Sequence, residues 1–502
     1  MSQYFISIED AERDLLAAAA YLVEQMPASD DRDEAMSAVV PQYLARGEVD
    51  LAAGLADAVD DPHVRDKLLI QVAAKCADLD DDEYAIQLAD AVEEYGLQAQ
   101  ARAAIAMTKA SKGDFEKARE IADSLTHPDE VLAGVAVRQA DAGDEAAAMD
   151  TLSEIDYPAA AVAALMAMAA MRLEKEDQPK AAEYLETAVS LALEIEHDEE
   201  RIRALADIGT AFVDAGRKDK AIETLDRARE YGEGLDNVHR DALLSAVSQG
   251  FMHAGSVDLA DRALDMVADK TQIANALLGF ARDYWRRDEA DEAYEALEES
   301  YEVLRSQRES ETRDTKAKNA LFASIAAQYA GFDRGERAIE IAEGIEDEEQ
   351  STAALAEIAR IMTKQSHDEL ARQALDAIPD EGRRALAIIG MSDVMANAGE
   401  NEAAISLLNE TADHLDNIQQ FSLRSLILNE IAARAAEHDL EGLFNRSFNG
   451  LFETLGQVKG DVHRVNALTG MSKVIDKYGL EIPDSDLERL RSFVASARAN
   501  VF

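Results

Sequence analysis

Covalent and metal cross-links are scarce in this chain of 502 residues, because it contains a single cysteine, Cys76. One cysteine excludes an internal disulfide and any zinc site built from several cysteines. The chain also has only 8 prolines and 5% aromatic residues, while alanine and leucine dominate its apolar residues. Proline breaks helices, whereas alanine and leucine are strong helix formers. The composition therefore favours an all-helical fold.

Long hydrophobic runs are missing as well. The apolar run from Leu15 to Val23 follows four acidic residues between Glu9 and Asp14, where a signal peptide would need positive charge. No other stretch approaches the roughly 20 apolar residues that span a bilayer. We therefore expect a cytoplasmic protein with no membrane partner.

Positive charge is also in short supply. The chain has 50 lysines and arginines against 101 aspartates and glutamates, a formal net charge of −51. Nucleic acids need clustered lysine and arginine, so we expect no nucleic-acid partner. The acid is spread along the whole chain, and arginine outnumbers lysine 34 to 16. Such a surface is typical of halophilic proteins, in which salt screens the repulsion. The alternative is a recognition surface for a basic partner.

An internal repeat organises most of the chain. In the segment 203–228 an amphipathic helix carrying Leu205, Ile208 and Phe212 is followed by Gly216 and then by a second amphipathic helix. A small or apolar residue recurs in the second helix, most often every 33 residues; we call these positions the column residues, and they are Ala52, Ala85, Ala118, Ala148, Ala181, Ala221, Ala260, Ala293, Ala338, Ala371, Ala404 and Phe444. Thirteen residues before each lies an apolar anchor residue in the first helix: Val39, Val72, Ile105, Val135, Met168, Ile208, Val247, Phe280, Ile325, Ile358, Met391 and Ile431.

Glycine supports the same register. Six column residues are preceded, five positions earlier, by a glycine that can end the first helix in the left-handed conformation: Gly47, Gly113, Gly143, Gly216, Gly255 and Gly399. Because one helix pair cannot bury its apolar face alone, the pairs are expected to stack and share one core.

The repeat unit resembles the tetratricopeptide repeat, whose usual period is 34 residues. The best match holds the family's signature positions at Leu205, Ile208, Gly209, Phe212, Ala221, Leu225 and Ala228. Elsewhere the large aromatic residue is often aliphatic and the closing proline is mostly absent, so the repeats are degenerate. The resemblance implies an α-solenoid, a right-handed superhelix of about 12 antiparallel helix pairs. Longer HEAT or armadillo repeats are the alternative, which the dominant gap of 33 disfavours.

Three regions follow from this register. Residues 1–30 are expected to hold an N-terminal capping helix over 7–25, residues 31–456 the repeat array, and residues 457–502 the C-terminal capping helices. Terminal repeats of such arrays present a polar outer face. We expect an exposed loop over 309–314.

No enzyme signature is present. The segment that starts at His367 lacks the second histidine of a zinc motif, and neither a GxxxxGK loop nor a GxGxxG turn occurs. We therefore expect no catalytic residue, no metal and no cofactor.

The concave face of such arrays is lined mainly by first helices in the tetratricopeptide family. Positions two and six residues after an anchor should therefore face this groove, which selects Arg282 and Arg286 in one repeat and Arg360 and Lys364 two repeats later. Ala327 and Gly331 lie between them and would leave room. Four cations together could bind a carboxylate-rich peptide; the simpler alternative is that they pair with neighbouring acids.

Two further groups of residues are candidates for partner binding. Trp285, the single tryptophan, either lines the groove or fills space between repeats. Met166 belongs to a methionine cluster in which Met168 is an anchor residue and Met166 is the member expected at the surface.

The sequence thus predicts a non-enzymatic interaction scaffold that binds a protein partner along the groove or edges of the repeat superhelix. The alternative is an acidic assembly chaperone that shields a basic protein. Self-association stays open, because stacked arrays have reactive ends if their caps are imperfect.

Overall fold

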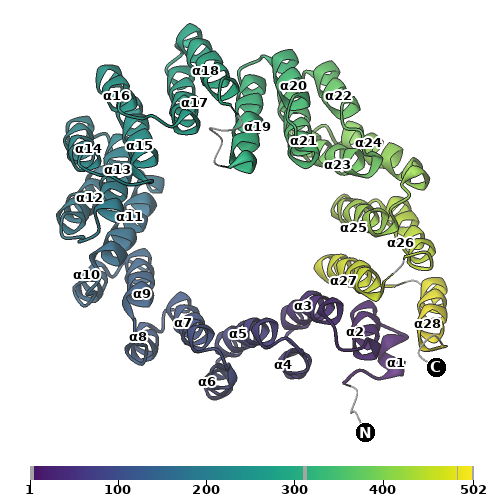
Figure 1. The fold of residues 1–502 in the computed structure, drawn as a ribbon. Helices are drawn as coiled ribbons and strands as arrows, with labels where there is room; N and C mark the ends of the chain where they lie inside the picture. Colours follow the sequence, from purple (N-terminus) through teal and green to yellow (C-terminus); the bar gives the residue numbers. More distant parts are fainter. Residues whose placement is uncertain (1–4, 309–313, 459, 483, 500–502) are drawn as a thin grey trace. The chain divides into compact units, whose positions relative to one another are not determined.

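The computed structural model describes residues 5–308, 314–458, 460–482 and 484–499, so most of the predicted loop over 309–314 lies outside the described residues. The described residues form 28 α-helices and no strand, as the sequence predicts (Figure 1). The chain divides into two units. Unit 1 comprises residues 1–108, 363–368 and 375–502, and unit 2 comprises residues 109–362 and 369–374.

The helices alternate between first and second members of a pair. The first helices are α3 (Asp30–Ala45), α5 (Pro62–Asp78), α7 (Tyr95–Ser111), α9 (Asp129–Asp141), α11 (Pro158–Glu174), α13 (Asp198–Asp214), α15 (Arg240–His253), α17 (Lys270–Arg286), α19 (Thr315–Gly331), α21 (Glu348–Lys364), α23 (Glu381–Asn397) and α25 (Phe421–Glu437). The second helices are α4 (Val49–Asp57), α6 (Asp82–Ala91), α8 (Phe115–Asp123), α10 (Glu145–Leu152), α12 (Gln178–Ala192), α14 (Lys218–Glu233), α16 (Val257–Leu264), α18 (Ala290–Arg305), α20 (Gly335–Glu343), α22 (Asp368–Asp376), α24 (Asn401–Asp413) and α26 (Glu441–Leu455).

Both predicted sets of packing residues are buried. Every anchor residue is at most 4% exposed, and every column alanine is at most 1% exposed. Phe444, which takes the column position in α26, is 7% exposed. A second helix packs on its own first helix and on the first helix of the next pair, as α14 does on α13 and α15. Small column residues allow this close approach because they add little bulk between the two backbones.

A left-handed residue separates the two helices of each pair. Gly216 has φ +70°, and its N–H donates to the carbonyl of Val213 while the N–H of Arg217 donates to that of Phe212, which is a Schellman motif. All six predicted glycines have positive φ. The remaining six turns hold a non-glycine residue in the same conformation, five positions before the column residue: Asp80, Glu176, Asp288, Asp333, Ser366 and Asp439. The turn geometry is therefore uniform even where glycine is absent.

Aspartates connect successive pairs in four places. The carboxylate of buried Asp66 in α5 accepts hydrogen bonds from the backbone N–H groups of Glu93 and Glu94, at 3.0 and 2.9 Å, in the connection that leads into α7. The equivalent residues Asp33, Asp129 and Asp241 accept from the N–H groups 27 and 28 positions later. Backbone groups that would otherwise lack a partner are satisfied in this way.

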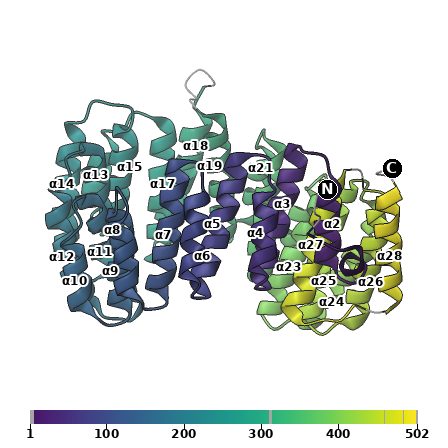
Figure 2. The same cartoon turned by 90° about the horizontal axis from the view of Figure 1, so that it is seen from below.

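The chain ends hold four more helices, namely α1 (Ile8–Ala11), α2 (Leu15–Gln25), α27 (Asp461–Tyr478) and α28 (Asp484–Ala499). The single helix predicted over 7–25 is thus two helices, because the backbone turns after Ala11 and Asp14 starts a new helix with its own side-chain cap. Within unit 1, α2 packs against both α27 and α3 (Figures 1 and 2). Whether residues 31–456 fold apart from the two end segments stays a prediction.

Replacing Gly143 by alanine tests the left-handed turn. Gly143 has φ +90° and an added Cβ would meet no atom within 4 Å, so the change adds backbone strain without a clash. We expect a loss of about 1 kcal/mol in stability, measured by urea denaturation followed by circular dichroism. As a control, Gly390→Ala lies in open space inside α23 and should leave stability unchanged or raise it. Equal effects of the two substitutions would contradict the argument.

Candidate functional site

Two neighbouring hollows lie on the first-helix face of unit 2. The first, the His253 pocket, has a volume of about 460 Å³ and is bordered by α13, α15 and α17. The second, the Arg282 pocket, has a volume of about 520 Å³ and is bordered by α17, α19 and Phe332. Arg282 lines both. The two hollows together extend along four successive first helices.

The repeat register explains which residues line these hollows. Positions two and six residues after the anchor hold Thr210 and Asp214 in α13, Gln249 and His253 in α15, Arg282 and Arg286 in α17, and Ala327 and Gly331 in α19; all eight line one of the two pockets. The rule that selects Arg282 and Arg286 from the sequence thus describes the face correctly. His253 and Asp214 lie at the same register positions, and the same rule could have found them.

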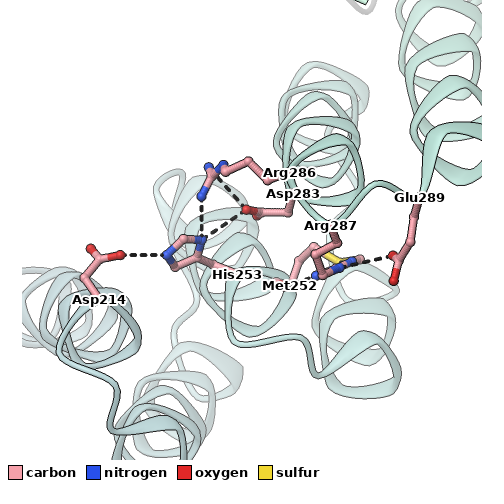
Figure 3. A network of polar contacts seen from close by, with 7 residues as sticks. All are labelled: Asp214, Met252, His253, Asp283, Arg286, Arg287 and Glu289. Carbon is pink, nitrogen blue, oxygen red and sulfur yellow. Dashed lines mark hydrogen bonds and ion pairs between the residues drawn. The ribbon is translucent and has the colours of Figure 1, made fainter.

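A chain of polar contacts crosses the His253 pocket (Figure 3). The imidazole of His253 has its Nε2 at 3.1 Å from a carboxylate oxygen of Asp214 and its Nδ1 at 3.0 Å from Asp283. Arg286 lies 3.2 Å from the same Asp283 oxygen. Three first helices therefore meet through one histidine.

The two carboxylates favour the imidazolium form of His253. The hydrogen bond to Asp283 raises the pKa of His253; burial opposes this effect, and the bond to Asp214 adds to it. With both ring nitrogens protonated, His253 donates to both carboxylates. Arg286 Nη1, at 3.2 Å from Nδ1, then faces a second donor, so Asp283 holds two cations together. Asp283 is suited to this because its side chain is only 10% exposed.

Arg287 fixes the spacing of α15 and α17 beside this network (Figure 3). Its Nη1 donates to the carbonyl of Met252 at 3.1 Å, near the end of α15, and its Nε donates to Glu289 at 3.1 Å. The guanidinium also lies over the ring of Tyr284, 4.9 Å from its centroid. These contacts hold the carbonyl end of α15 against α17.

The Arg282 pocket has a different character. Among the residues that line it, all of them described, Arg282 is the one with an ionisable side chain; Asn275, Ser324 and Gln328 supply the polar groups. Within the described parts of the chain, Arg282 is exposed and has no hydrogen-bond or ion-pair partner. Ala327 and Gly331 leave room here as the sequence predicts.

The other two predicted groove cations line neither hollow. Arg360 in α21 donates from Nε and Nη2 to both carboxylate oxygens of Glu357, at 2.8 and 2.6 Å, so it pairs with a neighbouring acid. Lys364 is exposed near the end of the same helix, in the part of the chain that belongs to unit 1. The recorded contacts thus join Arg286, but not Arg360, to the His253 network.

Trp285 fills space between repeats. Its side chain stacks on Phe332, with ring centroids 4.3 Å apart, and meets Tyr294 edge-on at 5.8 Å. It therefore joins the last turn of α17 to α18 and to the end of α19. Met166 is partly exposed on α11 while Met168 is fully buried, as their register predicts.

Among the described residues, no group of three or more His, Cys, Asp or Glu side chains could hold a metal ion. No described helix is long and apolar enough to cross a membrane.

The described residues form twelve helix pairs, in which the anchor and column residues are buried and a left-handed turn joins the two helices. The chain folds as a tetratricopeptide-like array with degenerate repeats. No protein-family model and no curated protein matches it. Several solved structures are similar at low identity. Ton1535 from Thermococcus onnurineus NA1 is 16% identical, with 70% of this chain and 97% of that chain covered and a TM-score of 0.24.

Two further solved structures extend over more of the chain. Naa15/Naa10 bound to HypK-THB is 14% identical, with 97% of each chain covered and a TM-score of 0.23. The APC/C hetero-tetramer Cut9-Hcn1 is 15% identical, with 88% of this chain and 90% of that chain covered and a TM-score of 0.20. At TM-scores below 0.5 these likenesses identify neither a family nor a function for the array.

The His253 network makes stability depend on pH. Because the pKa of His253 is raised in the folded chain, its charged form stabilises the fold at pH values below the unfolded pKa of about 6.5. That contribution is lost as pH rises through the folded pKa. We expect His253→Gln to reduce stability more at pH 5.5 than at pH 8.5, as measured by urea denaturation at both values.

The matched control for this test is His127→Gln. His127 is exposed, and within the described residues its side chain has no recorded partner, so its substitution should have the same small effect at both pH values. A His253→Gln effect that is independent of pH would show that the two carboxylates do not hold a charged imidazole.

Proposed function

We propose that the array is a non-enzymatic scaffold that binds an extended, carboxylate-bearing protein segment across the first helices α13 to α19. The observation that carries this proposal is Arg282, an exposed guanidinium that lines both hollows and has no partner among the residues that the structure describes. A guanidinium can bind a carboxylate through two parallel hydrogen bonds. Asn275 and Gln328 beside it can donate to, or accept from, the backbone of a bound segment.

The charge distribution supports this choice of ligand. A comparable hollow in unit 1, of about 280 Å³, is lined by Asp376, Glu381 and Glu410, which would repel a carboxylate. Its arginine, Arg384, already donates to the carbonyl of Ile378 at 2.7 Å. The lining of the Arg282 pocket includes no acid, and Arg282 has no partner among the described residues, so its guanidinium is available to a carboxylate.

Several features favour binding over catalysis. Among the residues that line the His253 pocket, all of them described, Thr210 carries the one hydroxyl, and it donates to the carbonyl of Ala206 in its own helix at 3.0 Å. The histidine is shared between two carboxylates on neighbouring helices, which suits it to fixing the spacing of α13, α15 and α17. The network therefore supplies a rigid floor for a ligand, with Arg282 as its recognition group.

The surface aspartates and glutamates outside the two hollows have a different role in this proposal. Many lysines and arginines pair with acids one turn away or in the next pair, as Lys117 does with Glu120 and Arg119 with Glu154. Excess carboxylates then form a solvated surface, as in halophilic proteins. The alternative function, an acidic chaperone for a basic protein, makes that surface the binding site.

An affinity capture from native lysate distinguishes the two functions. The baits are the wild-type chain, Arg282→Ala, and Arg262→Ala as a control, since Arg262 is exposed on the second helix α16 and has no described partner. We expect a partner that the wild type and Arg262→Ala retain and that Arg282→Ala binds at least tenfold more weakly, because a charge-assisted bond contributes about 1.5–3 kcal/mol.

The capture is repeated at low and near-molar salt, with mass spectrometry of the retained proteins. A basic partner that all three baits retain at low salt and lose at high salt would favour the chaperone. Equal retention by the three baits at both salt concentrations would contradict a role for Arg282.

A further inference from the structure

The N-terminal helix α2 occupies the place of a second helix in the last pair. Within unit 1, α27 lies between α25 and α3, as α15 lies between α13 and α17 in the regular array. The helix that packs on α27 and on the following first helix, α3, is α2. Helix α28, which follows α27 in sequence, packs on α26, α1 and α2 instead (Figures 1 and 2). One helix pair is therefore assembled from both ends of the chain.

The sequence register of α2 is that of a second helix. Asp14 lies four residues before Ala18, and its carboxylate accepts the N–H of Ala17 at 2.8 Å. In α12, Asp177 lies four residues before the column residue Ala181 and accepts the N–H of Lys180. Both Ala18 and Ala181 are fully buried.

The register of α27 is that of a first helix. Met471 is fully buried ten residues after the helix begins, and Ser472 beside it is 1% exposed. The anchor Ile208 has the same place in α13. Each half of the end pair thus carries the packing residues that the other half requires.

Arg46, at the end of α3, joins the parts of this pair. Its Nη1 and Nη2 donate to the two carboxylate oxygens of Asp14, at 2.9 and 3.0 Å. Its Nε donates to Asp476 at 2.8 Å, and Nη2 also reaches Ser472 at 2.8 Å, both in α27. Burial opposes the charge of Arg46, but the bonds to Asp476 and Asp14 outweigh it and raise its pKa.

The segment 5–26 also makes hydrogen bonds within itself. The N–H groups of Phe5 and Ile6 donate to the carboxylate of Glu24, at 2.6 and 3.2 Å, so the start of the segment folds back onto α2. Residues Leu15 to Val23 are all buried, and a helix that is apolar all round needs cover on every side. Only residues 27–29 connect the segment to α3.

We propose that residues 5–26 are an exchangeable docking segment, and that the α27–α3 site also takes this segment from a second copy of the chain. All contacts that hold the segment are non-covalent, so an identical segment from another copy offers the same Asp14 carboxylate and the same apolar face. Exchange of an identical element is a known route to dimers. If α2 leaves its own site, its apolar side chains are exposed to water, which is unfavourable. The α27–α3 site of a second copy can bury the same side chains.

The first experiment uses the full chain with a protease-recognition sequence inserted between Pro27 and Ala28. After cleavage, a fluorescently labelled synthetic peptide of residues 5–27 is added and followed by size-exclusion chromatography. We expect the cleaved chain to keep its own segment at first and then to exchange it for the labelled peptide. The Asp14→Ala peptide should bind at least tenfold more weakly, because it loses both the helix cap and the Arg46 pair.

The matched control is the Arg13→Ala peptide, since Arg13 is exposed and within the described residues its side chain has no recorded partner. It should bind like the unchanged peptide. Because these substitutions lie in the peptide, they leave the folding of the cleaved chain untouched. Failure of the cleaved chain to bind any labelled peptide would overturn the proposal.

The second experiment mixes two intact copies that carry different affinity tags, at high concentration. We expect complexes that contain both tags. A disulfide between cysteines introduced in α2 and α27 of the same copy would hold the segment in place, and these complexes should not form when both copies carry that disulfide. If the labelled peptide binds but doubly tagged complexes never form, exchange between copies is wrong. The Arg282→Ala substitution should change neither experiment, which separates this proposal from the proposed function.

Discussion

The close approach of two helices at a small buried residue is the contact on which the rest of this structure depends. An alanine such as Ala221 brings the second helix near the anchor of the first, and a left-handed residue five positions earlier reverses the chain in a fixed geometry. Because that geometry repeats, each first helix presents its positions two and six after the anchor to the same face. The two hollows of unit 2 follow from this constraint.

Charge acts on this scaffold at a second level. A chain with net charge −51 must separate or pair its carboxylates, and the structure uses both means. Buried aspartates such as Asp66 accept backbone N–H groups between pairs, and surface acids pair with neighbouring arginines. Arg282 is exposed and has no partner among the described residues, and, unlike Arg262, it lines two neighbouring hollows; this combination points to a ligand.

The sequence is sufficient for the periodic parts of the structure. Anchor and column residues, the six turn glycines and the groove positions of α17 and α19 all follow from one register. The six non-glycine turns are missed. Four of them hold aspartate, which adopts the left-handed conformation more readily than most residues, but aspartate is spread along the whole of this acidic chain and so marks no position. Arg360 is expected in a groove cluster, but a nearby acid, Glu357, captures it. In the His253 network, His253 contacts Asp283, 30 positions later, and Asp214, 39 positions earlier. Only the repeat register could have shown from the sequence that these residues lie together.

The end pair is missed for a different reason: the sequence places α2 and α27 at opposite ends of the chain. The spacing of Asp14 and Ala18 is nevertheless typical of a second helix, although no first helix precedes it in the sequence. This spacing could have predicted that α2 belongs to a helix pair. Hydrogen exchange of the full chain, followed by mass spectrometry, tests most directly whether helix pairs are the units of this fold. The account predicts that α2 and α27 are protected together, and that Arg46→Ala speeds exchange in both helices while α13 to α17 are unchanged. Rapid exchange of α2 beside a protected α27 in the unchanged chain would contradict it.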